Sequence, residues 1–185
     1  MAMVTVEPTT FSVVFFDASV ICDWARDVAD RLGFDGEEVH IVIDETSPLA
    51  RWHIAGDRPV RLLVDGGAFE DTRRPREMAE RRTRDVVGRA LLRVLDRRGD
   101  GFVDAPPDDE LTLAHAVAWD VYVVGRLARR FEHNGQRQRR LYQFRNRHGF
   151  SDAADAAFDR IWSADDLDWA ALIAISDGAR AVVTE

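Results

Sequence analysis

Four residues with aromatic or polar side chains recur at helical spacing within the segment 108–131. They occupy positions i, i+4, i+7 and i+11, so they form one row on a helix. The row consists of His115, Trp119, Tyr122 and Arg126. An imidazole, an indole, a phenol and a guanidinium placed together can stack on, hydrogen-bond to and neutralise an anionic ligand. The same row is also typical of a buried polar network that joins a helix to its neighbours.

The arginine-rich segment 126–148 follows this row directly. It holds eight arginines and a single acid, Glu132, so its formal charge is +7 and the rest of the chain sums to −15. We expect Tyr142, Arg145 and His148 to form the second wall of a groove that faces the row. Such a groove suits an anionic small molecule or an acidic protein surface. Alternatively, the segment docks on the protein's own acidic surface.

The sequence predicts a non-catalytic binding or interaction module, because it contains no complete catalytic constellation. The alternative is an enzyme that uses His115 or His148 as the acid or base in the same groove, with Asp120 as the orienting carboxylate. Asp120 falls on the apolar side of the helix, between Val117 and Val124. A carboxylate at that position requires a cation or hydrogen-bond donors, so we expect Asp120 to belong to a buried polar network.

A third function is binding of single-stranded nucleic acid through the segment 126–148. Arginines interleaved with Tyr142 and Phe144 are the residue types that contact phosphates and stack on bases. The net charge of −8 for the whole chain opposes this function, because a polyanion is repelled by an acidic protein.

Two sets of residues have some features of metal sites. His40 and His53, with Asp44 nearby, lie on neighbouring predicted strands and resemble a metal-ligand set. The segment 96–104 resembles a calcium loop, but Arg98 replaces a ligand and Pro107 replaces the bidentate Glu. We therefore interpret 96–104 as a turn between helices and predict no metal and no cofactor.

The composition of the chain indicates a cellular compartment but does not indicate a reaction. The chain of 185 residues contains 25 arginines and no lysine, so arginine content alone is no evidence of selection for phosphate binding. Cys22 is the only cysteine, which fits a reducing cytoplasm. The N-terminal residues lack the basic region of a signal peptide, and no apolar run is long enough to span a bilayer. We therefore expect a cytoplasmic protein without a membrane segment.

Hydrophobic periodicity predicts an α+β fold with a small, mostly antiparallel sheet and an all-helical C-terminal half. The four expected strands are 11–16, 38–44, 49–55 and 60–65, and the first two long helices are 19–32 and 75–97. We expect one domain over 1–185, in which 1–100 forms the sheet with two helices. The segment 108–178 is then a helical extension packed on it.

The expected order of a helix, strands and a long helix resembles the core of zincin metallopeptidases. Those enzymes carry His-Glu-x-x-His on the long helix, where two imidazoles bind zinc. The segment 75–97 contains no histidine, so zinc hydrolysis on this helix is excluded. The resemblance implies, at most, a degenerate relative without metal.

Overall fold

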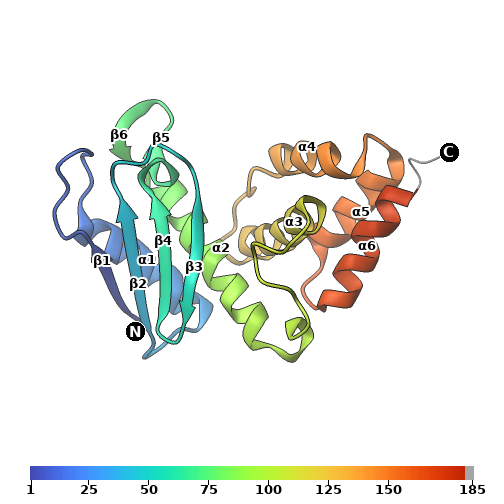
Figure 1. The fold of residues 1–185 in the computed structure, drawn as a ribbon, viewed down its shortest axis with the longest axis horizontal. Helices are drawn as coiled ribbons and strands as arrows, with labels where there is room; N and C mark the ends of the chain where they lie inside the picture. Colours follow the sequence, from blue (N-terminus) through green and yellow to red (C-terminus); the bar gives the residue numbers. More distant parts are fainter. Residues whose placement is uncertain (182–185) are drawn as a thin grey trace. The chain divides into compact units, whose positions relative to one another are not determined.

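The computed structural model describes residues 1–181 and divides the chain into two compact units, Met1–Val94 and Leu95–Glu185. The first unit contains a sheet with helices, and in the second unit the described residues, 95–181, form helices without a strand (Figure 1). The α+β class predicted from periodicity is therefore confirmed.

The main sheet of the first unit has four strands in the order β1-β2-β4-β3. They are β1 (Met3–Glu7), β2 (Glu38–Asp44), β3 (Trp52–Asp57) and β4 (Val60–Asp65). β1 and β4 both pair with β2 in parallel, and only β3 with β4 is antiparallel. The prediction of a mostly antiparallel sheet is therefore wrong. The reason is topological: the helix α1 (Ala18–Leu32) connects β1 to β2 as a crossover, and β3 reverses the chain so that β4 returns parallel to β2.

The first strand is Met3–Glu7, and the predicted strand at 11–16 is wrong. In β1, buried Val4 and Val6 alternate with exposed neighbours, as expected for a half-buried strand. The segment 11–16 instead forms a loop with a single bridge, from Phe15 to Glu77. Its run of apolar residues was interpreted as a strand because of its Val and Phe content alone, without a partner to pair with.

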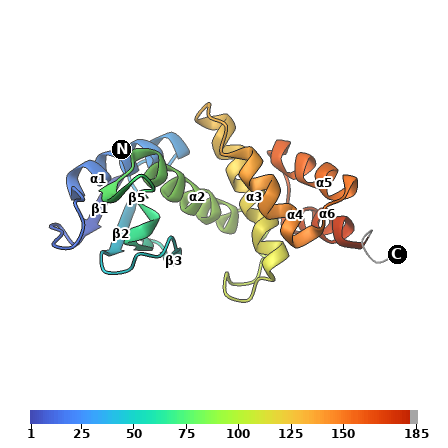
Figure 2. The same cartoon turned by 90° about the horizontal axis from the view of Figure 1, so that it is seen from above.

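One face of the sheet is covered by α1 and by α2 (Glu80–Arg98), which lie on the same side of the strands (Figure 2). The inward-facing side chains alternate along β2 and β4, in agreement with the periodicity of the sequence. They are Val39, Ile41, Ile43, Val60, Leu62 and Val64. The opposite face of these strands carries polar and half-exposed residues.

The long second helix begins at Glu80 and not at Pro75. The intervening residues form a hairpin of β5 (Glu70–Asp71) and β6 (Arg74–Met78). The amide of Ala79 donates to the carbonyl of Phe69 at 2.8 Å and closes the base of this hairpin. Pro75 therefore lies in a short strand rather than in the first helical turn, which corrects the predicted start.

The second unit is built around α3 (Leu113–Arg130), which contacts each of three further helices. They are α4 (Arg137–His148), α5 (Asp152–Ser163) and α6 (Trp169–Ala181). The side chain of Thr112 caps α3 by accepting a hydrogen bond from the amide of His115. The sequence predicts either fraying or an edge strand over 179–185. The chain is helical up to residue 181, and the rest of this segment lies outside the described residues.

Candidate functional site

Trp119, at the middle of the predicted row, is sealed inside the second unit with an exposed fraction of 0%. Its ring stacks on Phe102, with 5.1 Å between centroids, and also contacts Trp169 at 5.4 Å. The indole Nε1 donates to Oδ2 of Asp96 at 2.8 Å. This side chain is therefore fully satisfied by protein contacts.

Tyr122 and Arg126 continue this buried cluster along α3. The Tyr122 hydroxyl donates to the carbonyl of Asp165 at 3.0 Å, and burial raises the pKa of Tyr122. The guanidinium of Arg126 lies over the Tyr122 ring, 3.9 Å from its centroid. Nη2 of Arg126 donates to Oδ2 of Asp96 at 2.6 Å. One carboxylate thus ties together two members of the row.

The two histidines of the predicted groove both contact α6. Nε2 of His115 lies 2.9 Å from Oδ1 of Asp177, and Nε2 of His148 lies 2.8 Å from Oγ of Ser176. His148 is 2% exposed, its Nδ1 lies 3.0 Å from the carbonyl of Phe144, and burial lowers its pKa. Because α6 contacts both helices, it occupies the space in which the sequence analysis placed the groove.

Asp120 lies on another side of α3 from the row. Its Oδ2 accepts a hydrogen bond from Nη1 of Arg140 at 2.8 Å, and both side chains are largely buried. This ion pair connects α3 to α4. The carboxylate that was proposed to orient a catalytic histidine therefore holds an arginine.

Most arginines of the segment 126–148 pair with carboxylates of the same unit. At least five of the eight form such pairs, which are Arg126–Asp96, Arg129–Asp165, Arg137–Asp159, Arg140–Asp120 and Arg145–Asp155. Arg145 binds Asp155 through both Nε and Nη2, and each group shifts the pKa of the other toward its charged form. The strong positive charge of the segment is thus offset locally.

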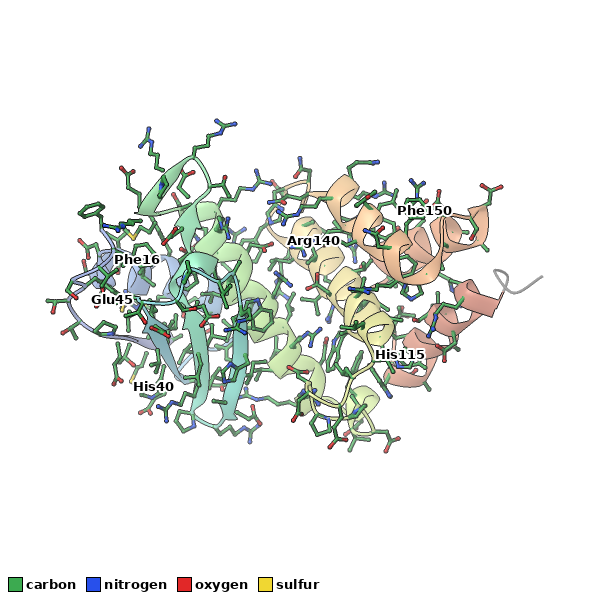
Figure 3. The ribbon with its side chains drawn as sticks, turned by 45° about the horizontal axis from the view of Figure 1, so that its top comes forward. Phe16, His40, Glu45, His115, Arg140 and Phe150 are labelled. Atoms are coloured by element: carbon green, nitrogen blue, oxygen red, sulfur yellow. The ribbon has the colours of Figure 1, made fainter. Side chains whose placement is uncertain are left out.

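The part of α4 that faces solvent forms a continuous stripe at helical spacing, which extends into the following turn. We call it the α4 stripe, and it consists of Arg139, Tyr142, Gln143, Asn146, Arg147 and Phe150. Tyr142 and Phe150 are 59% and 65% exposed, and their rings meet edge to face at 5.9 Å. Phe150 lies beyond the end of α4 (Figure 3). Among residues 1–181, Arg139 and Arg147 have no carboxylate partner.

The α4 stripe retains only part of the predicted site. Tyr142 belongs to it, and Arg145 supports it because its Cζ lies 6.0 Å from the centroid of the Phe150 ring. Phe150 was missed because it follows Gly149, where the helix ends. The sequence does carry a signal for Phe150. The helical spacing from Arg139 through Tyr142 reaches Phe150 when it is continued past the glycine.

The two strand histidines of the first unit are not neighbours. In the register of the sheet His40 lies beside Arg61, whereas His53 lies beside Leu63, and β4 separates the two histidines. His40 instead contacts Thr5, with 2.9 Å between Nδ1 and Oγ1. Within residues 1–181 no three His, Cys, Asp or Glu side chains are grouped as a metal site requires.

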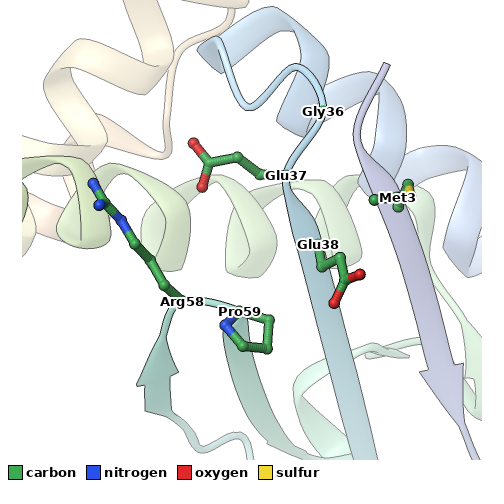
Figure 4. A pocket seen from close by; sticks show the side chains of 6 residues that line it. All are labelled: Met3, Gly36, Glu37, Glu38, Arg58 and Pro59. Atoms are coloured by element: carbon green, nitrogen blue, oxygen red, sulfur yellow. The ribbon is translucent and has the colours of Figure 1, made fainter.

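A shallow hollow of about 470 Å³ lies in the first unit, beside the start of β2 and the β3–β4 turn (Figure 4). Its lining comes from three segments and includes Glu37, Glu38 and Arg58. Charges of both signs surround an open depression here, so no single ligand chemistry is favoured.

Comparisons with known proteins give no functional information about this chain. No family model, curated protein or solved structure matches it. Of the helices described within residues 1–181, none has the length and apolar character needed to cross a membrane.

Proposed function

We propose that this protein is a non-catalytic interaction module that binds an acidic protein segment through the α4 stripe. The observation that carries the proposal is the exposed ring pair of Tyr142 and Phe150, flanked by Arg139 and Arg147. Exposed aromatic and arginine side chains in one patch are typical of the residues that dominate binding energy at protein interfaces. A cytoplasmic location suits this role, because a single cysteine fits a reducing compartment.

The rings supply the affinity in this proposal. Burial of exposed apolar surface contributes about 25 cal/mol per Å², so each ring contributes roughly 2 kcal/mol when a partner covers it. Tyr142 and Phe150 are already held in contact with each other, so little side-chain freedom is lost on binding. A complex of about micromolar affinity is the scale that these contributions support once the cost of association is included.

The arginines supply the preference for acidic partners. Arg139 and Arg147 lie on the same stripe as the rings, one near each end of α4. A partner with carboxylates around an apolar residue would cover the rings and pair with both guanidiniums. The stripe also carries amide side chains, Gln143 and Asn146, which bond to the backbone of an extended segment.

Nucleic acid fits the stripe less well than an acidic peptide. The affinity of a protein for a polyanion rises with the number of phosphates that its cations neutralise. Five arginines of the segment 126–148 are already paired with carboxylates, and the whole chain has a net charge of −8. The few outward cations of the stripe do not overcome this repulsion.

Fluorescence anisotropy with labelled probes tests the proposal. The probes are a Glu-rich peptide with one central aromatic residue, its Gln-substituted analogue, and a single-stranded oligonucleotide. We expect saturable binding of the acidic peptide alone, weakened at least about tenfold in the double variant Tyr142→Ser/Phe150→Ser. The matched control is Leu113→Ser, which changes an equally exposed apolar side chain at the start of α3. No binding of the acidic peptide, or equal binding by the double variant, would overturn the proposal.

A further inference from the structure

A second hollow lies on the uncovered face of the sheet in the first unit, at the carboxyl ends of β2 and β4. Its volume is about 600 Å³, which is within the range of small-molecule sites. The lining residues are Val42, Asp44, Arg51, His53, Leu63 and Asp65, with Trp52 and Val64 beside them. Ligands of sheets with parallel strands commonly bind outside the carboxyl ends of those strands.

The floor of the hollow is apolar. Val42 and Leu63 occupy paired positions on adjacent parallel strands, and both remain half-exposed. His53 lies beside Leu63 in the register of β3 and β4, so its imidazole borders this floor. A surface of this kind holds the hydrocarbon or aromatic body of a ligand.

Of the two carboxylates at the end of the floor, one has no cation partner among residues 1–181. Asp44 and Asp65 occupy paired positions on β2 and β4. Asp65 is neutralised by Arg51, whose Nε lies 2.8 Å from its Oδ2. Asp44 accepts hydrogen bonds from the amide and hydroxyl of Thr46, at 3.0 and 2.7 Å. These hydrogen bonds, with that from the hydroxyl the strongest, lower the pKa of Asp44 and keep it ionised.

The wall around these carboxylates is held by backbone contacts. The short helix η1 (Gly66–Ala68) follows β4, and the amide of Gly67 donates to the carbonyl of Ser47 at 3.1 Å. A Cβ on Gly67 would overlap the backbone of Pro48, so only glycine permits this approach. Arg82 from α2 donates to the carbonyl of Gly67 at 2.9 Å. The loop that follows Asp44 at the end of β2 is therefore fixed before any ligand arrives.

We propose that this hollow binds a small organic monocation, in which a primary ammonium or guanidinium group is attached to an apolar body. The charged group pairs with Asp44, and the body covers Val42 and Leu63. One uncompensated carboxylate selects a single positive charge, and the volume far exceeds that of a metal ion. The α4 stripe belongs to the other unit, so this site and the proposed function stand or fall separately.

Phenethylammonium is the probe, and neutral phenethyl alcohol is its isosteric control. In methyl-labelled protein, we expect saturable shifts of the Val42 and Leu63 methyl signals with the amine and not with the alcohol. Asp44→Asn preserves an acceptor for Thr46, and we expect it to weaken binding by about tenfold, as for loss of one charge-assisted hydrogen bond. Glu7→Gln, which removes one charge from the same sheet, should change the affinity less than about twofold.

Either of two results overturns the site. One is the absence of saturable methyl shifts with the amine. The other is an affinity that Asp44→Asn leaves unchanged, or that Glu7→Gln lowers to the same extent. The methyl spectrum of each variant without ligand should keep the signal dispersion of the unsubstituted protein, which distinguishes loss of binding from misfolding of the first unit.

Discussion

Asp96 and Arg126 form a buried ion pair, with 2.6 Å between Oδ2 and Nη2 and exposed fractions of 5% and 16%. This pair attaches the end of α2 to α3 within the second unit. Because Trp119 donates to the same carboxylate, the acid satisfies two members of the row, as in the buried polar network that is the alternative to a ligand pocket. The row on α3 therefore helps to hold α3 against the end of α2.

Arg126→Met should destabilise the protein by about 3 kcal/mol, because it leaves the buried Asp96 carboxylate without its cation. Arg139→Met, at an exposed position of α4, should change stability by less than about 0.5 kcal/mol. Chemical denaturation followed by tryptophan fluorescence measures both. A loss below about 1 kcal/mol for Arg126→Met would show that Asp96 is not dependent on this pair.

Gly125→Ala and Gly178→Ala should have effects of opposite sign. A Cβ at Gly125 would overlap the carbonyl of Trp162, so α3 and α5 would have to separate. A Cβ at Gly178, in α6, meets nothing within 4 Å. We expect Gly178→Ala to stabilise by roughly 0.5–1 kcal/mol and Gly125→Ala to destabilise despite its better helix propensity. Melting temperatures decide the matter, and equal shifts would refute the close packing of α3 on α5.

Val124→Asp should unfold the second unit at room temperature, because Val124 is fully buried in α3 and the new carboxylate has no cation. Leu113→Asp makes the same type of change at the exposed start of α3, where an acid suits the helix dipole. Circular dichroism should show lost helical signal for the first variant only.

Stability should fall as the pH is lowered below about 6.5, the ordinary pKa of histidine. Burial lowers the pKa of His148 in the folded state, so the unfolded chain binds the additional proton first. The carbonyl of Phe144 and, more weakly, Asp177 favour the charged imidazole, whereas Arg180 and His115 disfavour it. Denaturation midpoints at several pH values measure the slope, which His148→Gln should reduce. A slope unchanged in that variant would assign the effect to other groups.

The fold was predictable where a segment carried a local pattern. The strands at 38–44 and 60–65 alternate cleanly and have the predicted bounds. Whether the strands pair in parallel or antiparallel was not predictable in the same way. It depends on β1, whose alternating pattern is only five residues long. Pairing of β4 with β2 across the chain is a long-range choice that no local pattern specifies.

The sequence could predict which residue types lie near the candidate site, but not which of them are exposed to solvent. Helical spacing placed Trp119 and Tyr122 in one row, yet it could not show which neighbour would cover them. α6 covers that side of α3, and its own sequence gave no sign of its partner. Tyr142, by contrast, faces solvent, and its exposure depends on how α4 packs on the other helices. Salt pairs such as Arg140–Asp120 likewise join residues far apart in sequence.

Charge reversal on the α4 stripe tests the central proposal most directly. The variant is Arg139→Glu/Arg147→Glu, and Arg58→Glu/Arg61→Glu makes the same change in net charge on exposed positions of the first unit. We predict that the first weakens binding of the acidic peptide by about tenfold or more at physiological salt, whereas the second has a much smaller effect. Equal losses in both variants, or no loss in either, would contradict recognition of an acidic partner by this stripe.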